Sequence, residues 1–337
     1  MTIDKVYSNR KSNNGVYSDL IYEWEDDFAK GLDIPIISYS RFKNKLLNGM
    51  RKLLDKALIL PLVQNIDKRL KRKNFTLIFE LYPLDKFSYR VSSNKIPYII
   101  DFDFRVDLKA FYRTYKNCQL IIISSLQAYQ YLVENKCPLN IKHLQLSLSD
   151  QFQLNRSTIS KEFDVIIARS NRVLLDYVKK YAIDHPDFEY VVRKWAGNTL
   201  YKGNVYYSNK KGEIGEFSER SSYFALLKKT KVALYATPGY DEPERRFLNH
   251  VTPSLFEYIS SGCKIIARYP NNAETISFGL GTIAPSTESY DDFCKTLAFF
   301  LSSNDHSYLK ESEKFLQKNY TSKRISQFKS IILNQSL

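Results

Sequence analysis

The sequence predicts an α/β protein built from two successive domains, and three observations support this. Runs of β-branched and other apolar residues alternate with amphipathic helical stretches along most of the chain, which is typical of parallel sheets covered by helices. The alternation restarts near residues 150–160. The length of 337 residues exceeds one ordinary core and suits two domains of about 150 residues each.

The first half begins with the strand-like KVYS, the glycine-containing loop NRKSNNGVYSD, the helical stretch LIYEWEDDFAKGL and the strand-like IPIISY. This order forms a βαβ unit. Further strands are expected at FTLIFEL, IPYIIDF and QLIIISS, and AYQYLVENK is expected to be a helix that precedes the segment IKHLQLSL. We therefore expect a Rossmann-like domain up to about residue 150.

The second half repeats the alternation with FDVIIA, VLLDYVKKYAI, FEYVVR, NVYY, YFALLKK and VALYA. The stretch TPSLFEYISSGCKIIAR follows, in which Thr252 suits an N-cap, Pro253 a first helical residue and Gly262 a helix stop. Residues 263–267 then predict a buried strand. DFCKTLAFFLS, YLKESEKFLQ and SKRISQFKSIIL predict terminal helices after the pattern ends at GTIAP.

Composition excludes several classes of protein. An apolar content of 44% with 14% aromatic residues indicates a folded protein. The four cysteines and four histidines are scattered without metal-ligand spacing, so we expect reduced thiols, no structural zinc and a cytoplasmic protein. No signal-peptide core is present in the first residues, and the longest apolar run is far shorter than the roughly 20 residues of a membrane span.

The net charge of +14 indicates a polyanionic partner. Between residues 40 and 75 the chain carries eleven Lys or Arg and two Asp, and apolar residues recur there at helical spacing. A basic amphipathic helix is more typical of a membrane surface than of a nucleic-acid groove, although a solvated face of an ordinary packed helix is an equal alternative. The membrane-facing candidates are Lys43, Lys45, Arg51 and Lys52.

Two features of the second half predict an anion and nucleotide site. The helix start at Thr252, Pro253 and Ser254 offers free N–H groups to a phosphate, and the Glu257 carboxylate could accept hydrogen bonds from both ribose hydroxyls. Arg169 and Arg172 follow the first strand of this half, where a diphosphate would lie at the carboxyl edge of the sheet. Together they predict an anion site that needs no metal.

Asp101 and Asp103 follow a strand of the first half. An Asp-x-Asp pair holds a divalent cation in metal-dependent GT-A glycosyltransferases, and carboxylate oxygens suit Mg²⁺ or Mn²⁺. Alternatively, one carboxylate could position or deprotonate an acceptor hydroxyl. Strand-end acids that cap a loop are the third possibility.

The segment EYISSGCKIIARYPNNAETI resembles E-A-x-A-x-G-x-P-V-I-A-(x)-E-x-I, a motif of family 4 glycosyltransferases with the GT-B fold. Glu257, Gly262, the strand at residues 265–267 and residues 274–276 match in order. NNGVYSD, with Asn14 and Gly15, resembles the acceptor-side glycine loop of that family, and IPYIIDFDF followed by NCQLIIISS resembles its strand pair at the cleft. The chain departs from the family at Asn249, where the family has the first Glu of an E-x7-E pattern, and at the missing glycine pair after FDVIIA.

The resemblance implies two Rossmann-like domains that face a central cleft, followed by C-terminal helices. Residues 1–152 would bind the acceptor, residues 153–305 would bind the nucleotide sugar, and residues 306–337 would pack back toward the N-terminal domain. Asp101 and Asp103 would then be catalytic. The donor-binding candidates are Arg169, Arg172, Asn249, Thr252, Pro253, Ser254 and Glu257.

The sequence thus predicts a glycosyltransferase, of retaining stereochemistry, that moves a sugar from a nucleotide-sugar donor to a saccharide or lipid-linked acceptor in surface polysaccharide synthesis. No cofactor, metal or nucleic-acid partner is expected. The anionic inner face of the membrane is expected to be a partner. Two alternatives stay open: a GT-A enzyme that uses Asp101 and Asp103, and a non-catalytic basic protein that binds anionic membrane or nucleic acid.

Overall fold

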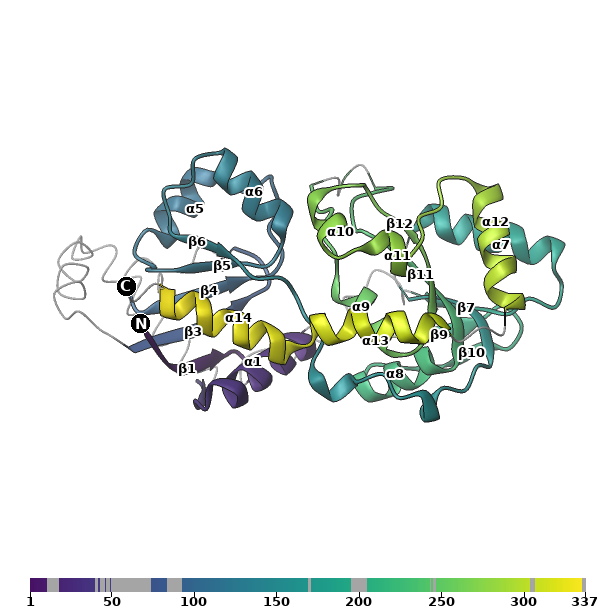
Figure 1. The fold of residues 1–337 in the computed structure, drawn as a ribbon, viewed down its shortest axis with the longest axis horizontal. Coiled ribbons are helices and arrows are strands. Elements are labelled where there is room, and N and C mark those ends of the chain that lie inside the picture. The colour runs from purple at the N-terminus through teal and green to yellow at the C-terminus, as the bar shows by residue number, and fades with distance from the viewer. Residues whose placement is uncertain are drawn as a thin grey trace. The chain divides into compact units, whose positions relative to one another are not determined.

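The computed structural model describes residues 1–10, 18–39, 42, 46, 49, 74–83, 93–168, 171–194, 205–242, 244, 247–303 and 307–334. The chain divides into two compact units, and each has its own sheet and core (Figure 1). Unit 1 comprises Met1–Ser149 and Thr321–Leu337. Unit 2 comprises Asp150–Tyr320.

Unit 1 is built on a six-stranded sheet in the order β2-β1-β3-β4-β5-β6, in which every neighbouring pair is parallel. Its strands are β1 (Thr2–Ser8), β2 (Ile36–Ser38), β3 (Asn74–Glu80), β4 (Lys95–Ile99), β5 (Ile121–Ile123) and β6 (Ile141–His143). Strands β3 and β5 are buried on both faces. Because neither face meets water, they read as continuous apolar runs and not as alternating ones.

The helices of unit 1 are α1 (Ser18–Leu32), α5 (Leu108–Tyr115), α6 (Leu126–Glu134) and α14 (Thr321–Asn334). Helix α14 packs along α1 (Figure 1). Phe328 of α14 is fully buried, and its ring meets that of Phe28 edge-on at 5.6 Å. Burial of one such side chain contributes about 1.5–3 kcal/mol, so a helix far along the chain helps to hold the first unit together.

Unit 2 is built on a second six-stranded sheet, in the order β10-β9-β8-β7-β11-β12. The four strands β8, β7, β11 and β12 are parallel, and β9 and β10 are antiparallel to their neighbours. The strands are β7 (Phe163–Ile167), β8 (Tyr190–Lys194), β9 (Val205–Ser208), β10 (Gly212–Glu216), β11 (Thr230–Ala236) and β12 (Lys264–Arg268). The predicted α/β class with two parallel-dominant sheets is confirmed.

The helices of unit 2 are α7 (Arg172–Asp184), α8 (Arg220–Lys228), α9 (Pro253–Ser260), α10 (Ala273–Ser277), α11 (Leu280–Ile283), α12 (Tyr290–Ser302) and α13 (Ser307–Asn319), with 3₁₀ turns η1 (Asp150–Phe152) and η2 (Arg156–Thr158). Helix α13 packs on α9, where the rings of Phe315 and Phe256 stack at 5.9 Å. The segment 306–337 was expected to pack back toward the N-terminal domain. Its second helix, α14, belongs to unit 1, whereas α13 belongs to unit 2.

The stretch from Thr252 to Arg268 has the structure that its sequence predicts. Helix α9 begins at Pro253 after the N-cap Thr252, and all its residues are buried. Gly262 has φ +67°, the left-handed conformation that ends many helices, and a Cβ on it would lie 2.4 Å from Ile159 Cδ1. Glycine is therefore required at this turn both by the backbone and by the packing.

Four elements were not foreseen in the sequence: β10, α5, α10 and α11. Strand β10 (GEIGE) carries one large apolar residue and pairs only with β9, so it lacks the apolar run of a buried strand. The helices are short. Asp107 accepts hydrogen bonds at the start of α5, and Asn272 forms a capping box with Thr275 at the start of α10, whereas α11 begins after Gly279 without a side-chain cap. Whether such short elements form depends on tertiary contacts and on capping residues more than on the spacing of apolar residues in the sequence.

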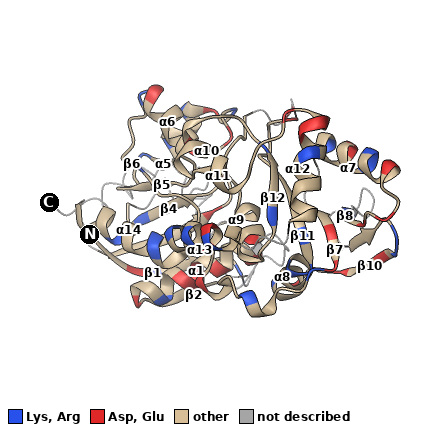
Figure 2. Ribbon diagram, turned by 45° about the vertical axis from the view of Figure 1, so that its right-hand side comes forward, with Lys and Arg blue, Asp and Glu red and all other residues tan. Residues whose placement is uncertain are grey.

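The charged residues of the described ranges are spread over both units, with basic and acidic positions intermixed (Figure 2). The membrane-facing candidates Lys43, Lys45, Arg51 and Lys52 lie outside the described residues. Across the ranges that the structure does describe, no helix has the length and apolar character that a bilayer crossing requires. All four cysteines are free thiols.

Candidate functional site

The carboxyl edge of the unit 2 sheet brings together segments that are far apart in the sequence. Because β7, β11 and β12 are parallel, the residues that follow them lie at one edge, where α7 and α9 also begin. Ligands of open α/β sheets bind outside this edge, where helix N-termini and polar loops meet. Arg172, Asn249 and the start of α9 all belong to segments at this edge.

Glu257 is the most informative of the predicted residues. It is 5% exposed and pairs with Arg220 at the start of α8, with Arg220 Nη1 2.5 Å from Oε1. A buried carboxylate without a partner would cost several kcal/mol, and the Arg220 guanidinium supplies that partner to Glu257 inside α9. The second carboxylate oxygen, Oε2, accepts no hydrogen bond from a described residue. It is therefore available to a hydroxyl of a ligand.

Two aromatic rings hold Arg220 in place. Its guanidinium carbon lies 5.3 Å from the ring centroid of Phe152 and 5.1 Å from that of Phe224, and these rings stack on each other at 4.0 Å. Arg220 was not among the predicted site residues, although its position in the sequence indicates that it has a specific partner. A basic residue in the first turn opposes the helix dipole, so an Arg at that position indicates a specific partner.

The start of α9 is fastened by polar contacts. The Thr252 N–H donates to Tyr235 Oη at 3.0 Å, and the Val251 N–H donates to Glu274 at 2.8 Å. The hydroxyls of Thr252 and Ser254 bond to each other at 2.9 Å, and both residues are almost fully buried. The side chains of this helix start are thus engaged within the fold, and Pro253 has no N–H to offer.

A buried ion pair ties the three strand ends together. Asp241, in the loop after β11, accepts hydrogen bonds from Arg268 Nε and Nη2, each at 2.8 Å, and from Asn171 Nδ2 at 2.9 Å. Arg268 Nη1 also donates to the carbonyl of Thr287 at 2.6 Å. Bonding to Asp241 raises the pKa of Arg268 above its ordinary value. The loop ends at this edge are therefore rigidly linked by charge-assisted hydrogen bonds.

The other donor-side candidates differ in what they can offer. Arg172 is exposed at the first turn of α7 and makes no contact with another described residue, so it is a free cation at the carboxyl end of β7. Asn249 accepts a hydrogen bond from Thr237 at 3.3 Å beside the end of β11. Arg169 lies outside the described residues.

Asp101 and Asp103 follow β4 in unit 1 and are both half-buried. Asp103 is bound by the guanidinium and the N–H of Arg105. The hydrogen bonds from Arg105 hold the pKa of Asp103 below its usual range. This engagement makes Asp103 a weak proton acceptor. Asn14 and Gly15 lie outside the described residues.

A second carboxylate lies near the end of β1, in unit 1. Glu25 of α1 is 2% exposed, and Arg10 Nη2 lies 3.3 Å from its Oε2 and 2.9 Å from Asp26 Oδ1. Burial raises the pKa of Glu25 to about 7, although hydrogen bonds with Ser8 and Arg10 oppose this shift. The sequence held a signal for it, because Glu25 lies one turn before the buried residues Phe28 and Ala29 on the inner face of α1.

The structure was also compared with the expectation that no metal is bound. Within the described ranges, no three His, Cys, Asp or Glu side chains come together in a way that could hold a metal ion. The positive groups at the unit 2 edge are guanidinium groups.

Comparisons with known proteins were made on both sequence and structure. No protein-family model matches the sequence, and neither does any curated protein. Solved structures do match. A sucrose-phosphate synthase from Thermosynechococcus elongatus aligns over 99% of both chains with a TM-score of 0.57 and 9% identity. The β-glucosyltransferase of phage T4 aligns over 99% of both chains with a TM-score of 0.53 and 12% identity.

The pneumococcal O-GlcNAc transferase GtfA, solved with UDP and GlcNAc, aligns over 81% of this chain with a TM-score of 0.50 and 14% identity. The chain spans 59% of the length of that transferase. These likenesses establish the fold: two parallel-dominant α/β units of the GT-B type, as the sequence predicts. At such low identities they carry over no activity.

Glu25 should make the stability of the protein depend on pH. The pKa of Glu25 is raised in the folded state. Its contribution to the free energy of unfolding is therefore fully present below the pKa of the unfolded chain, about 4.3, and is lost as the pH rises through about 7. We expect Glu25→Gln, which stays neutral, to gain in melting temperature relative to the wild type between pH 5 and pH 8.

Thermal unfolding followed by circular dichroism over that pH range measures this difference. The matched control is Asp26→Asn, which removes the exposed carboxylate bound to the same arginine; its difference from the wild type should stay nearly constant. If the two variants behave alike, Glu25 is charged throughout and the assignment is wrong.

Proposed function

We propose that the protein is a glycosyltransferase that moves a sugar from a nucleotide-sugar donor to a saccharide or lipid-linked acceptor. One observation carries the proposal: on a GT-B fold, Glu257 is a buried carboxylate fixed by Arg220 through Oε1, and its Oε2 accepts no hydrogen bond from a described residue. A carboxylate oriented in advance can accept hydrogen bonds from the ribose hydroxyls at little further entropic cost.

The remaining donor contacts are assigned by charge and position. Arg172, free and exposed at the carboxyl end of β7, would bind the diphosphate. Asn249 would face the donor sugar in place of the first Glu of the E-x7-E pattern. Thr252, Pro253 and Ser254 would contribute by forming the helix start, whose dipole favours an anion nearby. Arg169 would act with Arg172 on the phosphates.

On the acceptor side we assign acid–base chemistry to Asp101 and a positioning role to Asp103. Asp101 follows β4 at the same strand end as Asp103, and we assign it the part of accepting a proton from an acceptor hydroxyl, because the hydrogen bonds from Arg105 hold the pKa of Asp103 below its usual range. The GT-A alternative, in which both aspartates would bind a metal, gives no role to the α/β unit that carries Glu257.

The finer parts of the proposal rest on the sequence. The likeness of residues 257–276 to family 4 supports that family, a retaining reaction and a role in surface polysaccharide synthesis. The basic stretch 41–73 supports attachment to the anionic inner face of the membrane beside a lipid-linked acceptor. The cytoplasmic location follows from the scattered cysteines and the nucleotide-sugar donor.

We expect Glu257→Gln to weaken the binding of the cognate nucleoside diphosphate by roughly tenfold to a hundredfold. The substitution keeps the shape of the side chain but removes the charge from one or two hydrogen bonds. Calorimetric titration with UDP, TDP, GDP and ADP measures the change. Glu313→Gln, which removes an exposed carboxylate paired with Arg156 in the same unit, is the matched control.

Unchanged affinity in a folded Glu257→Gln protein would refute the ribose assignment. If the wild-type protein binds none of the four nucleotides, the transferase proposal fails, and a non-catalytic basic protein becomes the better explanation of its charge.

Sugar transfer should survive removal of divalent cations. We propose that Arg172 and Arg169 balance the charge of the departing diphosphate, as fixed cations can do without a metal. The measurement is the transfer rate with and without EDTA, at constant ionic strength. Loss of activity on chelation that Mn²⁺ or Mg²⁺ restores would contradict this and assign a metal to the reaction.

Replacing Lys43, Lys45, Arg51 and Lys52 together by Gln should release the protein from vesicles that contain phosphatidylserine. Each basic residue near such a surface contributes about 1 kcal/mol, so the loss of four amounts to roughly a thousandfold in partitioning at low salt. Cosedimentation with the vesicles measures it, and nucleotide affinity should stay unchanged.

A control variant removes the same charge from exposed lysines elsewhere, at Lys179, Lys210, Lys310 and Lys323. It should still sediment with the vesicles, because it lowers the net charge of the protein by the same amount but keeps the basic residues of the stretch 41–73. Equal release of both variants would mean that the stretch 41–73 has no special part in membrane attachment.

A further inference from the structure

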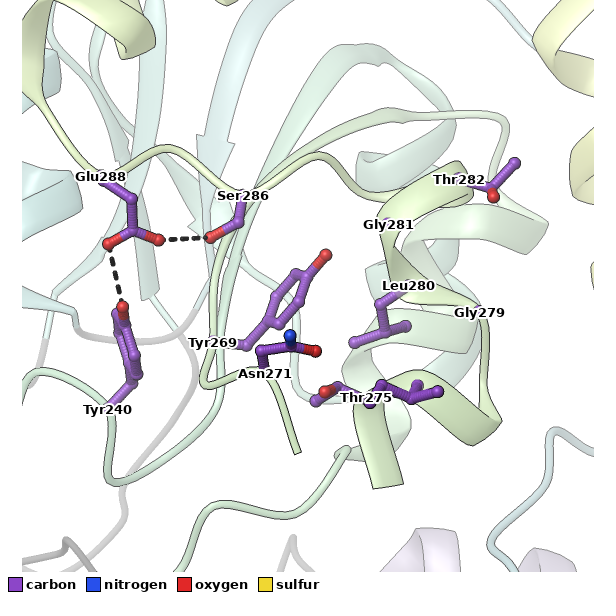
Figure 3. A pocket seen from close by; sticks show the side chains of 11 residues that line it. Tyr240, Tyr269, Asn271, Thr275, Gly279, Leu280, Gly281, Thr282, Ser286 and Glu288 are labelled. Atoms are coloured by element: carbon purple, nitrogen blue, oxygen red, sulfur yellow. Dashed lines mark hydrogen bonds between the residues drawn. The ribbon is translucent and has the colours of Figure 1, made fainter. Parts of the chain in front are cut away.

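A cavity of about 550 Å³ opens in unit 2 beyond the end of β12. Figure 3 shows Tyr269 and Asn271, which follow β12, on one side, and Leu280 and Thr282 of α11 on the other. Tyr240, from the loop after β11, and Glu288 complete the wall. The volume lies within the usual range for sites that bind small molecules. None of the residues that we assign to the donor lines it.

The two tyrosine rings of this cavity are fixed in position. Tyr240 Oη donates to Glu288 Oε2 at 2.9 Å, and Tyr269 Oη donates to the carbonyl of Ala284 at 3.0 Å. The guanidinium of Arg268 lies 5.3 Å from the ring centroid of Tyr240 and is itself held by Asp241. Rigid rings present an apolar face at little entropic cost, and the C–H face of a sugar ring packs well on such a surface.

Polar groups with free hydrogen-bonding capacity surround these rings. The Asn271 amide and the Thr282 hydroxyl make no hydrogen bond with a described residue, and both side chains are exposed at the cavity. Glu288 is oriented by Tyr240 and by Ser286, whose hydroxyl donates to Oε1 at 3.1 Å. An amide, a hydroxyl and a fixed carboxylate can together bind adjacent hydroxyl groups as donor and acceptors.

The charge of the cavity distinguishes between ligand classes. The protein carries +14 overall, yet the described residues that line this cavity include no Lys or Arg, and Glu288 is acidic. A phosphate or a nucleotide would meet the Glu288 carboxylate, while the guanidinium of Arg268 beside the Tyr240 ring is already paired with Asp241, so binding of an anion is unfavourable. A neutral ligand rich in hydroxyl groups has no such penalty.

We propose that this cavity is a second ligand site, one that binds a neutral sugar residue of a glycan acceptor or product. The nature of this ligand rests on the proposed transfer reaction, whereas the site itself is formed by Tyr240, Tyr269, Asn271 and Glu288 and by no residue of the nucleotide site. Such a site would retain a long glycan while its end reacts elsewhere.

Saturation-transfer NMR with the methyl glycosides of glucose, galactose, mannose, rhamnose and N-acetylglucosamine tests the proposal on the full chain. We expect at least one glycoside to bind in the millimolar range. Binding should fall by about fivefold or more in Asn271→Ala/Glu288→Ala, which removes two polar partners from exposed positions. Tyr269→Ala should weaken it as well, through loss of the ring surface.

Glu257→Gln is the control, because it changes the nucleotide site and leaves this cavity intact; it should bind the glycoside as the wild type does. Inorganic pyrophosphate should not displace the sugar. The proposal is overturned if no glycoside binds, if binding persists in the Asn271→Ala/Glu288→Ala variant, or if pyrophosphate competes. Loss of nucleotide binding in Glu257→Gln with glycoside binding retained would separate the two sites.

Discussion

The carboxyl edge of the second sheet depends on the buried pair of Asp241 and Arg268. The pair joins the loops after β7, β11 and β12, because Asp241 also binds Asn171 and Arg268 also binds the Thr287 carbonyl. Removing one partner of such a pair leaves a buried charge and typically costs 3–5 kcal/mol. The fixed loops in turn position Tyr240 for the cavity and Asn171 for the start of α7. The proposed ligand positions thus depend together on the hydrogen-bonded cluster of Asp241, Arg268 and Asn171.

Much of the fold could be predicted because it follows from local chemistry. Apolar runs predict the buried strands, and the sequence from Thr252 to Gly262 predicts where α9 starts and stops, since an N-cap, a first-turn proline and a left-handed glycine act through their own backbone. The hairpin strand β10 was missed because its residues carry little apolar pattern and owe their conformation to β9. The short helices α10 and α11 are likewise fixed by their neighbours, and α10 by its capping box as well.

The candidate site could be predicted only in part, because the sequence does not show which side chain each site residue contacts in the folded protein. The sequence marks Glu257 as unusual inside an apolar helix, but Arg220 lies 37 positions earlier and nothing local connects the two. Likewise the sequence does not show that Arg105 engages the carboxylate of Asp103, or that the hydroxyls of Thr252 and Ser254 at the start of α9 are bonded to each other. Residue types can be read from a sequence, whereas the state of each group depends on what folds against it.

The assignment of α14 to unit 1 affects the order in which the chain can fold during synthesis. Unit 2 is continuous from Asp150 to Tyr320 and holds all its own elements, whereas unit 1 lacks the Phe328 contact with Phe28 until a helix made after unit 2 has left the ribosome. Domains usually fold as they emerge, but here the first to emerge stays incomplete the longest. The ring of Phe28, which Phe328 covers in the folded protein, would stay uncovered on that side throughout the synthesis of unit 2.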